Sequence, residues 1–344
     1  MKDLWTLKYR PQDLGDFVGN EKAVSIMQHL VSAGKIPHLV VHGPAGSGKA
    51  SAVFALARGI YGDNFEHNFT YFNASDFFDQ GKRYLVRDKR FVRILGTDDP
   101  KKIRSSVISI FKDLVNEYAS MGSIDADYKI IFVDSAESLN ESAQHALRRI
   151  MERYSRTCRF IFSTTQPSRL ISPLRSRGLQ LFFTYVSDEE LVGFLGSVAD
   201  NEGLAYDPEA LAGLARHCKG NVDCALRLLQ SAALQHAGEK LSADIIFEVV
   251  MEDVPAGISS LQEAISAADF PLARKAIDKM LIEDGMSGVE IVRHLYRVLS
   301  DAGESSAVLA RLLLKIADAD LNVRSAANDR IHLERLVTEM ANVL

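Results

Sequence analysis

The sequence has few cysteines and no long apolar run. Its 344 residues contain three cysteines, Cys158, Cys218 and Cys224, and these lack the paired spacing of a zinc site or a disulfide framework. No apolar run is long enough to cross a bilayer, and residues 1–5 have no apolar region of the signal-peptide type. These absences exclude a disulfide-stapled or membrane-spanning protein, and we expect an intracellular, cytoplasmic protein without membrane contact.

An excess of positive charge is also absent. The chain has 40 Lys and Arg against 45 Asp and Glu, a formal net charge of −5. It therefore has no general electrostatic attraction to nucleic acid, and any DNA contact must depend on a local basic patch. The length and the 47% hydrophobic content are typical of a globular protein of two or three domains.

A glycine-rich segment at residues 42–51 is the most informative part of the chain. It fits the phosphate-loop spacing Gly-x4-Gly-Lys from Gly43 to Lys49. A short apolar strand over Pro37–Val41 precedes it and an alanine-rich helix over Ala50–Arg58 follows, which argues against a simple glycine turn with an exposed lysine. Glycines let backbone N–H groups face phosphate oxygens, and the helix N-terminus adds positive potential. The predicted phosphate-binding residues are Gly43, Pro44, Ala45, Gly46, Ser47, Gly48, Lys49 and Ala50.

The residues that should hold Mg²⁺ and water are altered. Ala50 occupies the position where a Ser or Thr normally follows the lysine. The apolar strand Lys129–Asp134 ends in a carboxylate of the kind that holds Mg²⁺, but Ser135 follows where an ATPase usually has Glu. Glu137 lies two residues further on in the turn, and we do not expect it to substitute. The sequence thus predicts nucleotide binding with a weakened Mg²⁺ site at Asp134.

Alternating strands and helices continue to about Phe183 and predict a mostly parallel sheet covered on both faces. The other expected elements of this α/β part are helices over Glu21–Ala33 and Ser142–Tyr154 and strands over Phe69–Asn73 and Arg159–Ser163. Only helices are expected afterwards, first over Asp188–Asn201, Pro208–His217 and Val222–Ala237. Beyond Pro255 the expected helices are Ser259–Ala267, Pro271–Met280, Ser287–Leu299, Ala307–Asn322 and Asp329–Leu344. This C-terminal part is most simply an oligomerisation module.

A basic segment at residues 77–96 has two interpretations. It carries six Lys and Arg against two Asp, with Tyr84 and Phe91 among them. It fits a patch that follows a phosphate backbone while its aromatics stack on bases, or a solvated hairpin or loop anchored by its aromatics, which we favour. A helix is expected over Lys101–Tyr118, and its basic first turn would favour a bound anion. The candidate DNA-binding residues are Lys82, Arg83, Arg87, Arg90, Lys101, Lys102 and Arg104.

Several short motifs, in the same order along the chain, resemble the replication factor C small subunit, a sliding-clamp loader of the AAA+ family. They are Lys8–Pro11, Phe17–Gly19, the phosphate loop, Asn73–Asp76, Gln144–Arg149 and Pro173–Arg177. The resemblance implies an AAA+ core over 1–184, a three-helix lid over 185–252 and a helical collar over 253–344 that holds five subunits together. It also implies that Tyr9, Arg10, Pro11, Val18 and Gly19 border the adenine.

The chain departs from this family at four positions of the reaction centre. Ala50 replaces the family's Thr and Ser135 replaces the Glu that orients water; Ser51 lies about 100° further around the helix and should point elsewhere. Thr165 aligns with the sensor 1 Asn, and Asp223 aligns with the sensor 2 Arg and puts a negative charge near a γ-phosphate. Together the four changes imply that this chain hydrolyses ATP poorly or not at all.

One catalytic element of the family is retained. Ser176 and Arg177 match its Ser-Arg-Cys motif, whose arginine acts in trans on a neighbour's ATP; otherwise Arg177 is an ordinary surface arginine. The resemblance thus implies a divergent second small subunit that binds ATP or ADP. Its implied partners are the large subunit, catalytic small subunits, the sliding clamp and primer–template DNA. The alternatives are an active ATPase in which Ser51, Glu137 or a water replaces the missing groups, a nucleotide-independent scaffold, and another AAA+ remodeller such as a branch-migration motor.

Overall fold

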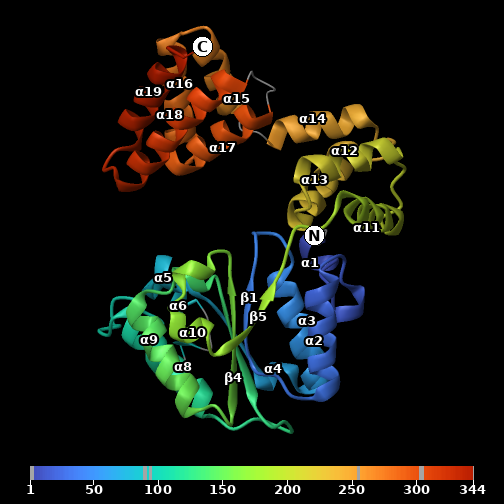
Figure 1. The fold of residues 1–344 in the computed structure, drawn as a ribbon, viewed down its shortest axis with the longest axis vertical. Helices are drawn as coiled ribbons and strands as arrows, with labels where there is room; N and C mark the ends of the chain where they lie inside the picture. The colour runs from blue at the N-terminus through green and yellow to red at the C-terminus, as the bar shows by residue number, and fades with distance from the viewer. Residues whose placement is uncertain (1–3, 88–90, 93–94, 254–255, 302–305, 344) are drawn as a thin grey trace. The chain divides into compact units, whose positions relative to one another are not determined.

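The computed structural model describes the chain except for residues 1–3, 88–90, 93–94, 254–255, 302–305 and 344. The described residues form two compact units, an N-terminal unit of residues 1–246 and a C-terminal unit of residues 247–344 (Figure 1). Within the described ranges no helix is long and apolar enough to cross a membrane.

The N-terminal unit contains a five-stranded parallel sheet with strand order β2-β3-β4-β1-β5. The strands are β1 (His38–His42), β2 (Phe69–Asn73), β3 (Lys129–Asp134), β4 (Cys158–Thr164) and β5 (Gly178–Phe182). The prediction of a mostly parallel sheet is confirmed. Strand β5 had no separate sequence signal because only Leu181 in it is buried, so it lacks the continuous apolar run of the inner strands.

Helices cover both faces of this sheet (Figure 1). One face packs Phe72, Ile131 and Phe160 against α8 and α9. The other packs Val41, Phe132 and Ile161 against α2 and α3. The helices of this region are α1 (Trp5–Lys8), α2 (Glu21–Ala33), α3 (Lys49–Tyr61), α4 (Phe65–Asn68), α5 (Ala74–Asp79), α6 (Lys82–Leu85), α8 (Val107–Ser120), α9 (Glu141–Arg153) and α10 (Ser172–Arg175).

The predicted start of the helix over Lys101–Tyr118 is wrong. Helix α8 begins at Val107, where the Ser106 hydroxyl accepts a hydrogen bond from the Ser109 amide at 3.2 Å. The Asp99 side chain accepts the backbone N–H of Lys101 at 2.9 Å and so forms a separate turn. Lys101, Lys102 and Arg104 are exposed residues ahead of α8, and the argument for an anion in its first turn does not hold.

The described residues of the basic segment 77–96 pack around its aromatics. Phe77 and Phe91 are buried, and the Phe91 ring stacks on Phe72 with centroids 5.8 Å apart. Tyr84 packs half-buried on the same core, and the buried Phe91 presents no open face for stacking on bases. The aromatics anchor the segment, and its described residues include the end of α5 and all of α6, where a hairpin or loop was expected. Arg83 and Arg87 are exposed, and the candidate Arg90 lies outside the described residues.

Four helices follow the sheet. They are α11 (Asp188–Asn201), α12 (Pro208–Cys218), α13 (Val222–Gln235) and α14 (Ala243–Asp253). The first matches its predicted bounds, since Ser187 and Glu190 form a capping box at its start. Helix α14 was not predicted, and the division between the two units falls within it, after Ile246.

The C-terminal unit is entirely helical in its described residues. Its helices are α15 (Ala256–Ser266), α16 (Phe270–Asp278), α17 (Gly288–Asp301), α18 (Ser306–Ser325) and α19 (Asp329–Ala341), with a π-helical turn at Lys279–Glu283. Buried apolar side chains from all five helices form one core.

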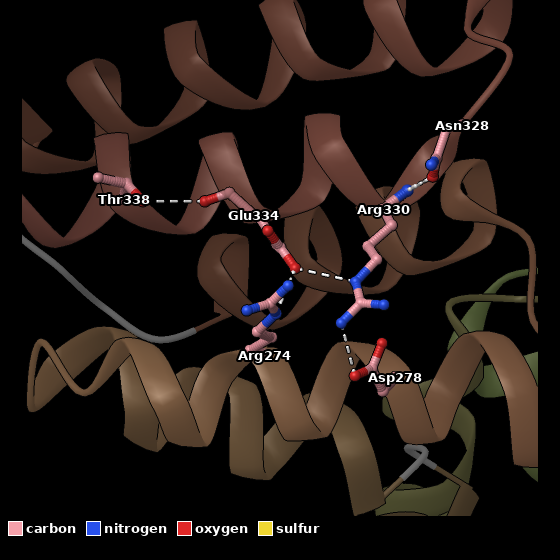
Figure 2. A network of polar contacts seen from close by, with 6 residues as sticks. All are labelled: Arg274, Asp278, Asn328, Arg330, Glu334 and Thr338. Carbon is pink, nitrogen blue, oxygen red and sulfur yellow. Dashed lines mark hydrogen bonds and ion pairs between the residues drawn. The ribbon is translucent and has the colours of Figure 1, made fainter.

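A network of charged side chains joins α16 to α19 on the surface of this unit (Figure 2). The Arg330 guanidinium contacts Asp278 at 2.8 Å and Glu334 at 2.9 Å, and Arg274 contacts Glu334 at 3.0 Å. The Asn328 side chain caps α19 by accepting the Arg330 amide at 3.1 Å.

Candidate nucleotide-binding site

The phosphate loop connects the end of β1 to the start of α3. Gly46 has φ +73° and Gly48 has φ +84°, which are left-handed conformations that favour glycine. A Cβ on Gly46 would lie 2.1 Å from the Asn221 side chain, and one on Gly43 would lie 2.1 Å from the Phe183 carbonyl oxygen. The loop therefore has neighbours too close for any larger residue at these positions, as a backbone cradle for phosphate requires.

Lys49 is the first residue of α3 and is almost buried. Its ammonium donates to the Pro44 carbonyl at 2.5 Å across the loop. Burial lowers the pKa of Lys49, and the nearby carboxylates of Asp134, Glu137 and Asp223 oppose that shift. Because it forms no ion pair with these groups in the described structure, the ammonium is available to a phosphate.

Two adjacent cavities meet at the loop. The first, of about 250 Å³, is lined by Lys49, by Asp134 and by all four altered positions, Ala50, Ser135, Thr165 and Asp223. The structure thus brings together, around the lysine, the residues that sequence reasoning assigned to one reaction centre.

The second cavity is lined largely by apolar side chains. Tyr9, Arg10, Pro11 and Val18 line it, and Gly19 lies beside Val186, 3.2 Å from where its Cβ would be. The residues that the resemblance placed at the adenine are therefore neighbours here. Sequence reasoning missed other lining residues, among them Val186, Phe194 and Leu226, because their spacing along the chain carries no signal that they share a cavity.

Asp134 ends β3 at the floor of the first cavity. Burial raises its pKa, while hydrogen bonds from Ser163 and from the Ser135 amide and the charge of Lys49 favour the ionised form. Ala50 supplies no side-chain oxygen to a Mg²⁺ ion, whereas the Asp134 carboxylate can supply one. The site therefore has the cradle and lysine for a nucleotide and a carboxylate at the end of β3, without the hydroxyl that normally follows the lysine.

Two residues that were not expected to contribute, Glu137 and Ser51, line the first cavity. Glu137, in the 3₁₀ turn Ala136–Ser138 after β3, accepts the Thr165 hydroxyl at 2.6 Å, and its other oxygen is buried without a hydrogen-bond partner. Although burial opposes ionisation of Glu137, hydrogen bonds from Thr165 and Thr164 hold its pKa below the ordinary value. Ser51 lines both cavities, so the expectation that it points elsewhere is wrong. The cavities extend around the N-terminus of α3, and a residue 100° from Ala50 still borders them.

Arg177 lies outside both cavities, in the turn between α10 and β5. Its guanidinium donates to Glu152 at 2.7 Å and to the Pro173 carbonyl at 2.8 Å. Its side chain is 35% exposed. Among the described strands β5 pairs only with β1, so Arg177 is on the open edge of the sheet.

The fold and this site define the class. A parallel sheet of this order, a phosphate loop after β1 and a carboxylate at the end of β3 are the features of an AAA+ P-loop protein. Among solved structures, the chain is similar to the RuvB Holliday junction branch migration motor of Thermotoga maritima, with TM-score 0.53 and 17% identity over 76% of this chain and 80% of that one. That likeness concerns the fold alone.

Sequence comparisons identify the family. The model for the replication factor C C-terminal domain matches residues 254–339, and that for the DNA polymerase III delta subunit matches residues 19–187. The replication factor C small subunit of Methanocella arvoryzae is 31% identical over 97% of this chain and 95% of its own length. That of Thermoplasma volcanium is 31% identical over 100% and 98%. The chain belongs to the replication factor C small subunit family.

Proposed function

We propose that this chain is a specialised clamp-loader subunit that binds ATP or ADP with little or no hydrolysis of its own. It supplies Arg177 to ATP held by a neighbouring subunit. Its partners in this proposal are a replication factor C large subunit and catalytic small subunits. Their assembly loads the sliding clamp onto primer–template DNA in an ATP-dependent reaction.

The observation that carries this proposal is the convergence of the altered residues on one cavity. Ala50 offers Mg²⁺ no hydroxyl, and Ser135 and Thr165 are not the Glu and Asn expected to orient the attacking water. Asp223 lines the same cavity and adds negative charge where a γ-phosphate needs positive charge. One such change weakens one interaction, whereas all of them remove most of the transition-state stabilisation from a single site.

The in-trans role of Arg177 is consistent with its exposure. An arginine finger contributes a factor of about 10³–10⁵ in rate, or roughly 4–7 kcal/mol of barrier. Glu152 holds the guanidinium by one of its carboxylate oxygens, and a phosphate of a neighbouring subunit can replace that oxygen with similar geometry. A subunit with a degenerate site of its own can therefore still be required for its neighbour's hydrolysis.

We propose the domain division of core 1–184, lid 185–252 and collar 253–344. The match of the replication factor C C-terminal domain to residues 254–339 supports the second boundary. The lid then comprises α11–α14, one helix more than the three that were expected.

One observation favours the alternative of an active ATPase. Ser51 and Glu137 line the first cavity, so an oxygen one residue after Ala50 and a carboxylate two residues after Ser135 are both near Lys49. In this alternative Ser51 takes part in holding Mg²⁺ and Glu137 orients water.

Measurement of ATP hydrolysis separates the proposal from its alternatives. The purified chain is assayed alone and then with a catalytic small subunit, with and without clamp and primed DNA. We expect no turnover alone and stimulation in the mixture, together with binding of a fluorescent ADP analogue. Turnover by the chain alone supports the active ATPase, and absence of analogue binding supports the nucleotide-independent scaffold.

A further inference from the structure

Two of the three cysteines lie side by side at the junction of α12 and α13. Cys218 is the last residue of α12 and is buried, whereas Cys224 lies in the first turn of α13 and is half-buried. Their Sγ atoms are 3.0 Å apart. A disulfide bond of about 2.05 Å therefore needs only a small approach of the two sulfurs.

The residues between these cysteines contact the nucleotide-binding site. The Asn221 side chain caps α13 by accepting the Cys224 amide at 3.0 Å, and it also packs on Gly46 of the phosphate loop. Asp223 lines both cavities. Gly220 has φ +79° and is in close contact with the Val186 carbonyl. The two thiols therefore flank a short segment that forms one wall of the nucleotide cavities.

The surroundings of the pair favour oxidation over metal binding. Cys224 is near the N-terminus of α13, where the helix dipole favours a thiolate. In the described part of the chain no cluster of three metal-ligating side chains includes the two cysteines. Cys158 provides a contrast within the same molecule, since burial in β4 raises its pKa to about 12 and keeps it unreactive.

We propose that Cys218 and Cys224 form a reversible dithiol–disulfide site that reacts with a peroxide, and that the disulfide slows nucleotide exchange. The Cys224 thiolate attacks one peroxide oxygen, which gives a sulfenic acid and releases water after protonation. The Cys218 sulfur then displaces the sulfenic oxygen as a second water and loses its proton. Two thiols and one hydrogen peroxide thus give one disulfide and two waters, the thiols being oxidised and the peroxide reduced.

The effect on nucleotide follows from the position of the cross-link. The disulfide joins the ends of the segment that bears Asn221 and Asp223 and reduces the freedom of that wall. Because a bound nucleotide must leave past a wall of the cavity, we expect slower dissociation. This second part of the proposal rests on the proposed nucleotide binding, whereas the chemistry of the thiol pair does not.

The test treats the full-length chain with hydrogen peroxide and reads two independent signals. Mass spectrometry of peptides detects a Cys218–Cys224 cross-link, with Cys158 as the internal control that stays reduced. Release of a fluorescent ADP analogue is then timed before oxidation, after it, and after reduction with dithiothreitol. We expect a cross-link in most molecules and roughly fivefold slower release, both reversed by reduction, and no change of release rate in Cys224→Ser or in Cys218→Ala.

Other results overturn the proposal in distinguishable ways. If no cross-link forms in the intact chain, the proposed thiol site is wrong. If the cross-link forms and the release rate is unchanged, the proposed control of nucleotide exchange is wrong. If the reduced chain fails to bind the analogue, the proposed nucleotide binding fails, and the cross-link measurement still decides the thiol chemistry. Because Cys224 is half-buried at a helix start, Cys224→Ser is the variant less liable to disturb folding, and its melting temperature serves as the check.

Discussion

Charged side chains are arranged differently in the nucleotide cavities of the N-terminal unit and on the helices of the C-terminal unit. Around the phosphate loop, Lys49 faces three carboxylates without forming an ion pair in the described structure, and buried atoms of Arg10 and Glu137 lack hydrogen-bond partners. In the C-terminal unit, each of the four charged residues that join α16 to α19 forms at least one ion pair (Figure 2).

The difference indicates what each set of charges is for. A buried polar atom without a partner costs free energy, and beside the nucleotide cavities a bound ligand can satisfy such an atom. The charges between α16 and α19 are paired and hold the helices together, although the second oxygen of Asp278 is also buried without a hydrogen-bond partner. Substitutions in the first set should alter nucleotide binding with little change in stability, and substitutions in the second set should lower stability with little change in nucleotide binding.

The largest expected effect lies outside both sets, at Arg177. In the assembled complex, we expect Arg177→Ala to abolish the hydrolysis that this subunit supports, a fall of about 10³-fold or more, because the neighbour's transition state loses a cation. Lys49→Ala should change hydrolysis only mildly, since the site that it belongs to contributes little. Steady-state ATPase rates measure both.

Arg156→Ala is the matched control for this comparison, because Arg156 is an exposed arginine of the same unit. Its rate should equal that of the unmodified complex. Equal loss of activity in Lys49→Ala and Arg177→Ala would contradict the degenerate-site proposal and favour an active ATPase.

A smaller effect is expected from the charge at position 223. Asp223→Arg replaces a carboxylate near Lys49 by a cation, and at short range one charge shifts a phosphate's interaction by more than 1 kcal/mol even in a polar site. We expect the affinity for a non-hydrolysable ATP analogue, relative to ADP, to rise about tenfold, which is 1.4 kcal/mol. Fluorescence titration with both nucleotides measures it.

Glu189→Arg reverses the charge of an exposed residue of α11 and controls for net charge. It should leave the ratio of the two affinities unchanged. If Asp223→Arg also leaves that ratio unchanged, Asp223 does not face the γ-phosphate, and the assignment of this position fails.

The parts of this molecule that the sequence predicted are those specified locally. The phosphate loop follows from its own spacing, and α2 has its predicted bounds because Gly34, with φ +64°, ends it. The predicted start of α8 was wrong because Pro100 and the residues of the turn at Asp99 are also typical of a helix start. Pattern reasoning could not find what tertiary packing decides, such as the contact of the Asn221 side chain with Gly46.

In the C-terminal unit, we expect Arg330→Ala to lower the free energy of unfolding. The change leaves Asp278 unpaired and Glu334 with Arg274 alone. The Arg330 and Asp278 side chains are each 35% exposed, so water screens part of the loss. Ion pairs of this exposure contribute up to about 1 kcal/mol each, and a decrease of about that size is expected in thermal or urea unfolding.

Arg324→Ala is the control for this network, because it removes an isolated and more exposed pair with Asp320 on α18. Its effect should stay within about 0.5 kcal/mol. Nucleotide affinity should not change in either variant. If Arg330→Ala lowers nucleotide affinity without lowering stability, the proposed difference in role between the two sets of charges is wrong.

The smallest effect is expected at the basic residues near α6, which belong to neither set. Arg83, Arg87, Lys101 and Lys102 are exposed. Lys82 donates to the Ile103 carbonyl at 2.7 Å and is therefore less available to a phosphate. Reversal of the four exposed charges to Glu should lower DNA affinity several-fold if they bind phosphates. For each phosphate that the protein no longer neutralises, the slope of log affinity against log salt concentration should become shallower by about 0.9. Reversal of four exposed basic residues elsewhere in the unit, Lys22, Lys35, Arg156 and Arg169, controls for net charge. An unchanged slope in the fourfold variant of the segment would make it purely structural.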